Sequence, residues 1–369
     1  MRKKVAGVYL VVEKGIIKQS GAYERIKIGF EELSQRFSLR LVSPHFADKT
    51  TESSSKNKYD KNGIRGLLRD LKLLWNNHRT IWKLYKEVKS DQPDFIYELA
   101  SYLDYKGLII ARILRIRHFY EVNGILYISR EKYYRTYFKY LAKQLERWAY
   151  LKSDYNFFVG SYGDFFKFER KNWINIENGV EKKYISFFRG ESKVIADKVH
   201  FAFLGNGMNY QRPEVLINAI KSVENYDGMV LHVGGINNQD VITNLSGVIE
   251  VIDHGYLNKI ELCNMMTSVH VGLIAGSPVY QSSMKLFDYG AAKCLVIAPE
   301  IYNLKNWFND QEVLYFDGTA SAMAEKIESV LKEPALIEEY GSKLFKKIDD
   351  EFTWDGIFGQ IGDSIEDNL

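Results

Sequence analysis

The sequence lacks the features that would assign it to several special classes of protein. None of its apolar runs approaches the roughly 18–20 uninterrupted residues that a membrane-spanning helix needs. Its two cysteines, Cys263 and Cys294, are too few for a disulfide framework and lack the spacing of metal ligands, which favours a reducing compartment. Hydrophobic residues make up 46% and charged residues 26% of the chain, as in ordinary globular proteins. We therefore expect a folded cytoplasmic protein.

Length and charge indicate two domains of different character. A chain of 369 residues is long for one core, so two domains of roughly 150–200 residues are expected. Residues 1–180 contain 34 Lys and Arg against 20 Asp and Glu, whereas residues 181–369 contain 16 against 27. The net charge of +3 thus combines a basic first half with an acidic second half. The basic half favours an anionic surface or substrate.

Apolar runs typical of buried strands alternate with helical patterns in both halves. The first half has such runs at 5–12, 39–42, 95–97, 118–122 and 155–160. The second half has apolar runs of the same kind at 199–204, 229–233, 248–252, 269–274, 294–297 and 313–316. This alternation predicts parallel sheets built from βαβ units, and hence an α/β fold with two doubly wound domains. The weakly periodic segment 181–198 is the candidate linker.

In doubly wound sheets, ligands bind at the carboxyl ends of the strands, so the turns that follow strands are the candidate sites. The run 199–204 is followed by Gly205-Asn206-Gly207, and Arg212 precedes the next helix. Glycines let the backbone approach a ligand, and a helix amino terminus offers free N–H groups to an anion. The run 248–252 leads into His254-Gly255-Tyr256. Each turn also has a simpler interpretation, a tight connection without a ligand.

The segment 275–289 carries the most specific pattern in the chain. A strand ends in small residues, a loop with Ser282 follows, and a helix begins near Ser283. Hydroxyl groups, the helix amino terminus and the cationic Lys285 would converge on a diphosphate. Asp288, about one turn later, could accept both hydroxyls of a ribose. The alternative is a serine helix cap with a Lys–Asp surface pair.

Together these motifs resemble the retaining GT-B enzymes of glycosyltransferase family 4, especially bacterial members that build surface polysaccharides. The resemblance extends over nearly the whole chain. The motifs on which it rests are Ile96-Tyr97-Glu98, Glu121-Val122-Asn123-Gly124, Glu177-Asn178-Gly179-Val180-Glu181, Phe203-Leu204-Gly205, His254-Gly255-Tyr256 and residues 283–289. It implies two Rossmann-like domains that face a central cleft. Residues 1–180 would bind the acceptor, residues 181–353 would bind the donor, and a final helix at about 354–369 would return to the first domain.

The resemblance implies a donor site in the second domain. Its residues would be Gly205, Asn206, Gly207, Arg212, His254, Gly255, Tyr256, Ser282, Ser283, Met284, Lys285, Leu286 and Asp288. Where many relatives carry a glutamate beside the donor sugar, this chain has Tyr280, and the usual phosphate-binding Arg and Lys align with Asn206 and Gln211. We therefore predict that Lys285, helped by Arg212, neutralises the leaving diphosphate.

In the family the acceptor docks on the first domain, where Ser20-Gly21-Ala22-Tyr23 matches the loop that closes over the reacting centre. Asn123-Gly124 replaces the His-Gly of many relatives, so an imidazole base is missing there. Retention by front-face attack lets the departing phosphate take the acceptor's proton, so the protein mainly positions groups and stabilises charge. The candidate catalytic residues are Lys285, Glu98, Glu121 and Asn123. Glu98 and Glu121 have an alternative role, as strand-end carboxylates bonded to backbone N–H groups.

Two predicted helices of the first domain carry basic stripes beside aromatic residues. The helix at 63–89 has Arg65, Arg69, Lys72, Arg79, Lys83 and Lys86, and the helix at 130–152 has Lys132, Arg135, Lys139, Lys143 and Arg147. Such stripes are either solvated faces or docking surfaces for an anionic membrane, where each basic residue contributes roughly 1 kcal/mol. Nucleic-acid binding is not predicted, because no recognised reader module is present.

The predicted function is the retaining transfer of a hexose-type sugar from a nucleotide sugar, UDP by family frequency, to a glycan or lipid-diphosphate-linked acceptor. No cofactor or metal is expected, since no Asp-x-Asp motif occurs. The expected location is the cytoplasm, peripheral to the inner face of the cell membrane. Two alternatives stay open: an inverting GT-B enzyme such as a glucuronosyltransferase, and a catalytically silent GT-B protein that scaffolds polysaccharide assembly.

Overall fold

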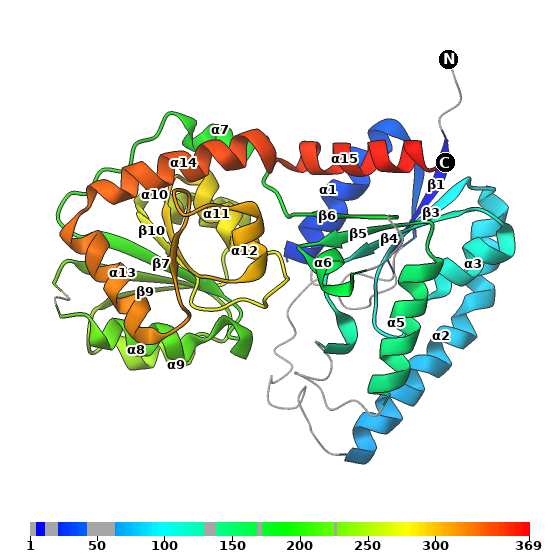
Figure 1. The fold of residues 1–369 in the computed structure, drawn as a ribbon, viewed down its shortest axis with the longest axis horizontal. Coiled ribbons are helices and arrows are strands. Elements are labelled where there is room, and N and C mark those ends of the chain that lie inside the picture. Colours follow the sequence, from blue (N-terminus) through cyan, green and yellow to red (C-terminus); the bar gives the residue numbers. More distant parts are fainter. Residues whose placement is uncertain (1–4, 12–20, 43–62, 129–137, 168–171, 225–226) are drawn as a thin grey trace. The chain divides into compact units, whose positions relative to one another are not determined.

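A computed structural model describes residues 5–11, 21–42, 63–128, 138–167, 172–224 and 227–369. By its internal contacts the chain divides into two compact units (Figure 1). The first unit consists of Met1–Ile176 together with Phe358–Leu369, and the second consists of Glu177–Ile357. Each unit is built around one parallel sheet.

A six-stranded sheet forms the centre of the first unit, in the order β2-β1-β3-β4-β5-β6. Its strands are β1 (Ala6–Val11), β2 (Ser38–Val42), β3 (Phe95–Leu99), β4 (Arg117–Val122), β5 (Tyr155–Val159) and β6 (Trp173–Ile176). All neighbouring strands are parallel. Val8, Ile96 and Phe119 in the central strands are fully buried. Near-continuous apolar runs are what a parallel sheet covered on both faces requires.

Helices connect these strands and cover the sheet. They are α1 (Gly21–Arg36), α2 (Gly63–Asp91), α3 (Lys106–Leu114), α5 (Lys139–Lys152) and α6 (Tyr162–Phe166). The C-terminal helix α15 (Trp354–Asp367) lies beside α1 (Figure 1). Gly29 makes this contact possible, because a Cβ there would come within 2.5 Å of the Phe358 ring. An ion pair between Arg36 and Asp363 joins the same two helices.

A second six-stranded parallel sheet forms the centre of the other unit, in the order β12-β11-β10-β7-β8-β9. Its strands are β7 (Val199–Gly205), β8 (Met229–Gly235), β9 (Glu250–Gly255), β10 (Val271–Leu273), β11 (Leu295–Pro299) and β12 (Leu314–Phe316). Its helices are α7 (Lys182–Arg189), α8 (Pro213–Ser222), α9 (Gln239–Leu245), α10 (Lys259–Ser268), α11 (Met284–Ala291), α12 (Tyr302–Trp307), α13 (Ala320–Lys332) and α14 (Ala335–Glu351).

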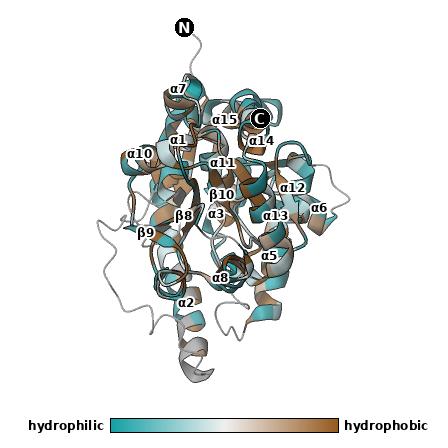
Figure 2. Ribbon diagram, turned by 90° about the vertical axis from the view of Figure 1, so that its left-hand side faces the viewer, coloured by the Kyte–Doolittle hydropathy of each residue, from teal (hydrophilic) through white to brown (hydrophobic). Residues whose placement is uncertain are grey.

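Alternate residues of β7 show how this sheet is covered on both faces. Val199, Phe201 and Phe203 pack into a core with α8 and α13, and none of them is more than 4% exposed. On the opposite face Gly272 of β10 lies against the ring of Tyr289 on α11. The helices carry hydrophilic and hydrophobic residues side by side (Figure 2), as helices with one buried face do. The carboxyl edge of the sheet is left for the connecting turns.

The predicted α/β class with two doubly wound sheets is confirmed. Two segments differ from prediction. Residues 181–198, predicted as a linker, contain helix α7, whose Tyr184 and Phe188 are buried in the second unit. Strand β6 is not among the predicted strands, because a four-residue strand at the sheet edge leaves only a short pattern. None of the helices in the described part of the chain is long and apolar enough to cross a membrane.

Candidate functional site

Helix α11 is fixed to the second sheet by Tyr289. The Tyr289 hydroxyl accepts a hydrogen bond from Leu204 N (3.0 Å) and donates one to Ala202 O (3.0 Å), so the side chain reaches strand β7. Gly272 leaves room for the ring, because a Cβ there would lie 2.3 Å from it. The amino terminus of α11 is thereby held at the carboxyl edge of the sheet, where ligands bind in doubly wound folds.

The loop before α11 is held by hydrogen bonds to the first residues of the second unit. The side-chain amide of Asn178 donates to Ser282 Oγ over 2.8 Å. Its neighbour Glu177 accepts a hydrogen bond from Asn303 Nδ2 (2.8 Å), and Asn303 N donates to Val279 O (2.8 Å). The Glu-Asn pair of the motif that resembles family 4 therefore shapes the loop that precedes the candidate anion site.

Lys285, in the first turn of α11, has a buried ammonium group that lacks a counter-charge. Within the described residues its Nζ makes no hydrogen bond, and it lies 5.4 Å from the centre of the Phe203 ring. Burial lowers the pKa of Lys285 to about 7. A buried cation is costly unless it is paired. The Nζ is itself enclosed in the ligand-free protein, so its contact with a diphosphate stays a prediction. The first turn of α11 would add to the attraction for an anion.

The turns after β7 and β8 pack so closely that glycine is required. A Cβ on Gly235 would lie 1.7 Å from Gly205 O, and Gly207 has a φ of +66°. Gln211, which aligns with a phosphate-binding lysine of the family, is 5% exposed and accepts a hydrogen bond from Asn206 N (3.1 Å). Gln211 therefore braces this turn and does not reach toward a ligand.

Arg212, predicted to assist Lys285, already has partners. Its Nη1 donates to Gly318 O (2.8 Å), and its Nε lies 3.3 Å from Glu214 Oε1. Its side chain also fills the space beside Gly276, where a Cβ would lie 2.6 Å from Arg212 Cγ. Arg212 thus links the turns after β7, β10 and β12, and its contact with a diphosphate stays a prediction.

The carboxylate of Asp288 is paired with Lys259 on α10. Lys259 Nζ lies 2.7 Å from Asp288 Oδ1 and 4.2 Å from the centre of the Tyr184 ring. The Asp288 side chain is 18% exposed. This contact leaves Oδ2 and a second lone pair of Oδ1 as acceptors, so the prediction that Asp288 accepts both hydroxyls of a ribose stays a prediction.

His254 ends a chain of three imidazoles that crosses strands β7, β8 and β9. His200 Nδ1 lies 2.8 Å from His232 Nε2, and His232 Nδ1 lies 2.9 Å from His254 Nε2. Burial lowers the pKa of His232 to about 4 and shifts the pKa of His254 in the same direction. These two rings are therefore neutral at pH 7, and each contact uses a single N–H donor.

A cavity of about 430 Å³ borders the turn after β9. Gly255 in this turn has a φ of +56°, which favours glycine, and Tyr256 is 45% exposed. The cavity is lined by His254, Tyr256, Leu257, Glu261, Asn264 and Met265. Its volume lies within the range of small-ligand pockets.

The other residues predicted for the donor site differ in what they can contact. Leu286 is 0% exposed, so its side chain belongs to the core and the prediction that it touches a ligand is wrong. Ser282 and Ser283 are each 7% exposed. Ser283 is the N-cap of α11, but its side chain makes no capping hydrogen bond. Met284 is half-buried.

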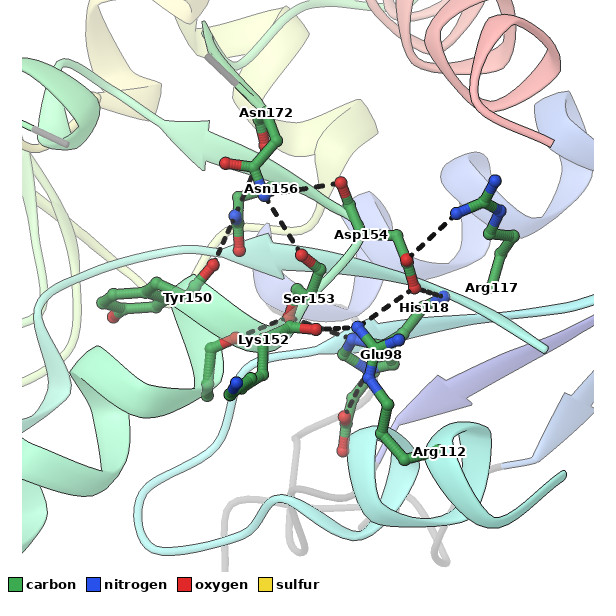
Figure 3. Close-up of polar contacts among 11 residues, drawn as sticks. Glu98, Arg112, Arg117, His118, Tyr150, Lys152, Ser153, Asp154, Asn156 and Asn172 are labelled. Atoms are coloured by element: carbon green, nitrogen blue, oxygen red, sulfur yellow. Dashed lines mark hydrogen bonds and ion pairs between the residues drawn. The ribbon is translucent and has the colours of Figure 1, made fainter. Parts of the chain in front are cut away.

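In the first unit, Glu98 lies inside the fold and not at an open site. Its carboxylate accepts hydrogen bonds from Gly107 N (3.1 Å) and Leu108 N (3.1 Å), and His118 Nε2 lies 2.8 Å from Oε2 (Figure 3). The side chains of Glu98 and His118 are both 0% exposed. The prediction that Glu98 orients an acceptor is therefore wrong. Its alternative role, a strand-end carboxylate bonded to backbone N–H groups, is the one observed.

His118 extends this network to Ser153. His118 Nδ1 lies 3.0 Å from Ser153 Oγ, which gives a Ser–His–Glu arrangement with hydrogen-bond distances like those of a catalytic triad (Figure 3). Ser153 is only 2% exposed, and its hydroxyl also donates to Ala149 O (2.7 Å). No substrate can reach this hydroxyl, so the network stabilises the fold.

Glu121 is buried beneath Asn123 at the carboxyl end of β4. Its carboxylate accepts hydrogen bonds from Arg25 Nε (2.8 Å), Asn123 Nδ2 (2.9 Å) and Tyr97 OH. Burial alone would raise the pKa of Glu121, but Arg25 and these hydrogen bonds lower it. An ionised carboxylate can only accept, so Asn123 must donate through Nδ2 and turn its Oδ1 away. Glu121 cannot itself touch an acceptor, which corrects that prediction, whereas Asn123 is exposed.

The predicted acceptor loop falls partly within the described residues. Ser20 lies outside them, Gly21 begins α1, Ala22 is exposed and Tyr23 is half-buried. In the same described ranges, no group of three or more His, Cys, Asp and Glu side chains is arranged to hold a metal ion.

Sequence reasoning missed Lys259 and Arg25. Lys259 lies in the first turn of α10 and Arg25 in the second turn of α1, whereas the prediction examined the turns that follow strands. The Asn258–Glu261 capping box signals where α10 begins and thus where Lys259 lies. The sequence holds no comparable signal for Arg25.

Comparison with known proteins gives consistent results. A family model described as glycosyl transferase-like matches residues 212–363. A glycosyltransferase from Rickettsia africae ESF-5 is similar with a TM-score of 0.70 at 14% identity, covering 100% of this chain and 99% of that one. A sucrose-phosphate synthase from Thermosynechococcus elongatus gives 0.73 at 12% identity, with 99% of each chain covered. HepE of Anabaena, in complex with UDP and glucose, gives 0.67 at 13% identity, with 98% and 100% covered. A search of curated proteins gives no match.

These similarities confirm the predicted GT-B fold. The matched family model adds that residues 212–363 of this GT-B chain are glycosyl transferase-like. Because the solved structures share only 12–14% identity with this chain, the likeness extends to the fold and not to the substrate.

Proposed function

We propose that this chain is a retaining glycosyltransferase of the family 4 type, with the donor bound by the second unit and the acceptor by the first. The donor is a UDP-sugar with a hexose, and the acceptor is a glycan or a lipid-diphosphate-linked saccharide of a bacterial surface polysaccharide. The observation that carries the proposal is Lys285, whose buried ammonium group has no partner among the described residues. A nucleoside diphosphate would supply the missing counter-charge.

The leaving group determines what the protein must do. Breaking the bond between the sugar carbon and the diphosphate oxygen adds a negative charge to the diphosphate, which Lys285 and the N–H groups of α11 would stabilise. The acceptor hydroxyl attacks from the same face, and its proton passes to the departing phosphate oxygen. Asn123 would accept a hydrogen bond from this hydroxyl and orient it, because Glu121 keeps its Nδ2 occupied. This division of roles requires no metal ion and no separate base.

The choice of UDP is supported by a structural neighbour and not by a residue of this chain. HepE of Anabaena has been solved in complex with UDP and glucose. The cavity beside Tyr256 offers a place for the base in the second unit. Backbone groups of the turn at Gly255 would form hydrogen bonds with the polar atoms at the edge of the base.

Isothermal titration calorimetry with UDP, GDP, ADP and UMP tests this proposal. We expect a nucleoside diphosphate to bind, UDP most tightly, and UMP to bind at least about tenfold more weakly because it lacks the second phosphate that pairs with Lys285. If no nucleoside diphosphate binds at millimolar concentration, the proposed transferase function is wrong.

Product analysis separates the proposal from its two alternatives. The anomeric configuration of the product, determined by NMR, distinguishes a retaining enzyme from an inverting one such as a glucuronosyltransferase. Binding of UDP without any turnover of UDP-sugars, even by hydrolysis, would indicate a silent scaffold protein.

We further propose that α2 docks on an anionic membrane surface. Leu68, Trp75 and Trp82 recur at seven-residue spacing and are 59%, 66% and 63% exposed. The same spacing relates three exposed basic residues, Lys72, Arg79 and Lys86. Aromatic rings enter the headgroup region of a bilayer, and basic side chains pair with anionic lipids. The side chains of Arg65, Arg69, Lys132 and Arg135, also predicted for this surface, lie outside the described ones.

Flotation with lipid vesicles tests this docking surface. We expect the protein to float with vesicles that contain phosphatidylglycerol and not with pure phosphatidylcholine vesicles. The double substitution Trp75→Ser and Trp82→Ser should reduce flotation by about tenfold or more, because two exposed rings are lost from the interface. Val194→Ser, which removes a 74% exposed apolar residue of the second unit, is the control and should float normally. Flotation that does not depend on anionic lipid would contradict the proposal.

A further inference from the structure

Lys259, Asp288 and Tyr184 come from three helices of the second unit and meet at one point. Lys259 Nζ lies 2.7 Å from Asp288 Oδ1 and 4.2 Å from the centre of the Tyr184 ring. The Tyr184 hydroxyl also donates to the backbone oxygen of Asp288 over 3.5 Å. Helix α7 is distant in the sequence from the consecutive helices α10 and α11, so tertiary packing brings the three side chains together.

The position of Lys259 is set by the cap of α10. Asn258 Oδ1 accepts hydrogen bonds from Ile260 N (2.9 Å) and Glu261 N (3.1 Å), and Glu261 Oε2 accepts one from Asn258 N (2.8 Å). This capping box fixes the first turn of the helix, in which Lys259 stands. Burial would lower the pKa of Lys259, but the neighbouring Asp288 raises it, so Lys259 stays charged at neutral pH.

The pairing gives the two oxygens of Asp288 different roles. Oδ1 is bonded to Lys259, whereas Oδ2 makes no hydrogen bond within the described residues. The side chains of Lys259 and Asp288 are 38% and 18% exposed, so the pair is partly shielded from water and more strongly coupled than a surface pair. One oxygen holds the carboxylate in place, and the other is free to accept a hydrogen bond.

We propose that Lys259 is a positioning residue for recognition of the donor's ribose, an inference that rests on the nucleotide site proposed above. Lys259 holds Asp288 so that Oδ2 can accept a ribose hydroxyl. It also offsets the negative charge of Asp288, which stands three residues after Lys285 on the same helix. Without this offset, the carboxylate would repel a diphosphate bound at Lys285. Lys259 therefore makes a carboxylate compatible with a site for a highly charged anion.

Calorimetry with UDP and 2′-deoxyuridine diphosphate tests this role. We expect the wild type to bind UDP about tenfold more tightly than the deoxynucleotide, the effect of one hydrogen bond to a charged group. Lys259→Met should weaken UDP binding by about tenfold or more and reduce the preference for UDP to less than about twofold. Lys259→Arg, which retains the charge, should restore most of the preference. Lys332→Met, which removes a surface pair with Glu328, is the control and should leave both affinities unchanged.

The preference for UDP over the deoxynucleotide separates positioning from a merely structural role. If Lys259→Met weakens both nucleotides equally, or changes neither, the proposed role is overturned. If the wild type binds UDP without any preference, the ribose contact is overturned while the nucleotide site stands. A wild type that binds neither nucleotide overturns the proposed function together with this inference. Should Lys259→Met fail to fold, Lys259→Arg and Asp288→Ala decide, because Lys259→Arg must keep the preference and Asp288→Ala, which removes both acceptor oxygens, must lose it.

Discussion

Replacing Lys285 with methionine is expected to weaken UDP binding by about 100-fold or more and at the same time to stabilise the ligand-free protein. Methionine has a similar length and no charge. The affinity falls because the diphosphate loses a buried cation. The stability rises because folding lowers the pKa of Lys285 to about 7 from roughly 10.4 in the unfolded chain, a cost on the order of a few kcal/mol. A lysine with a structural role would give the opposite sign of stability change.

The same side chain should make UDP binding depend on pH. The pKa of Lys285 is about 7 in the free protein, and a bound diphosphate raises it because a nearby anion favours the charged form. Above about pH 7, binding therefore takes up a proton, and the affinity falls by up to about tenfold per pH unit. The phosphates of UDP add little to this dependence, since their last pKa is about 6.

Two measurements check these expectations. Calorimetric titrations of UDP between about pH 7 and about pH 9 should show a rising dissociation constant for the wild type and a flat one for Lys285→Met. Thermal unfolding without ligand should show a higher melting temperature for Lys285→Met, and no comparable change for the surface variant Lys332→Met. A wild type whose affinity is independent of pH, or a methionine variant that binds UDP normally, would show that Lys285 does not hold the diphosphate.

The sequence predicts those parts of the fold and site that depend on local pattern. The apolar runs and the helices between them mark the two sheets, because strand and helix periodicities are local properties. The turn glycines are also predictable, since the close approach of Gly235 to Gly205 excludes any side chain. Lys285 is a predicted site residue because it stands at the start of a helix that follows a strand, and the structure has that helix begin at Met284. In each case a single segment carries the signal.

The roles of charged residues are less predictable, because they depend on partners distant in the sequence. Glu98 and Glu121 look alike as strand-end carboxylates, yet backbone N–H groups bind one and Arg25 binds the other. The Lys259–Asp288 pair joins two residues that are 29 positions apart and stand on different helices. Whether such a carboxylate faces a ligand or the core depends on tertiary packing. The periodicity of hydrophobic residues along the sequence does not indicate it.

Replacing Glu121 with glutamine is expected to destabilise the first unit by about 3–5 kcal/mol. Arg25 and Glu121 are 4% and 0% exposed, and their Nε and Oε1 atoms are 2.8 Å apart. The substitution removes the carboxylate that balances the buried charge of Arg25. Glutamine also keeps only one acceptor oxygen, so either Tyr97 OH, now bonded to Oε2, or Asn123 Nδ2, now bonded to Oε1, loses its acceptor. A buried charge that loses its partner costs far more than a surface pair is worth.

A matched control and a double substitution make this prediction specific. Asp363→Asn breaks the pair that joins Arg36 of the same helix α1 to α15, but its partners are 36% and 66% exposed, so its cost should stay below about 1 kcal/mol. The double variant Arg25→Met with Glu121→Met removes both charges and should be more stable than either single variant. Such recovery would show that the uncompensated charge, and not lost packing, causes the effect.

The contribution of Glu121 should also depend on pH in a defined direction. The pKa of Glu121 is lower in the folded protein than in the unfolded chain. Glu121 therefore stabilises the folded state at pH values above its pKa in the unfolded chain, and this stabilisation is lost as the pH falls through its pKa in the folded protein. The difference in unfolding free energy between wild type and Glu121→Gln should therefore be largest near neutral pH and shrink in acid. Urea denaturation followed by hydrogen exchange in β3 and β4 measures it within the first unit. A difference as small as that of Asp363→Asn at neutral pH would mean that the Arg25–Glu121 pair does not hold this edge of the sheet together.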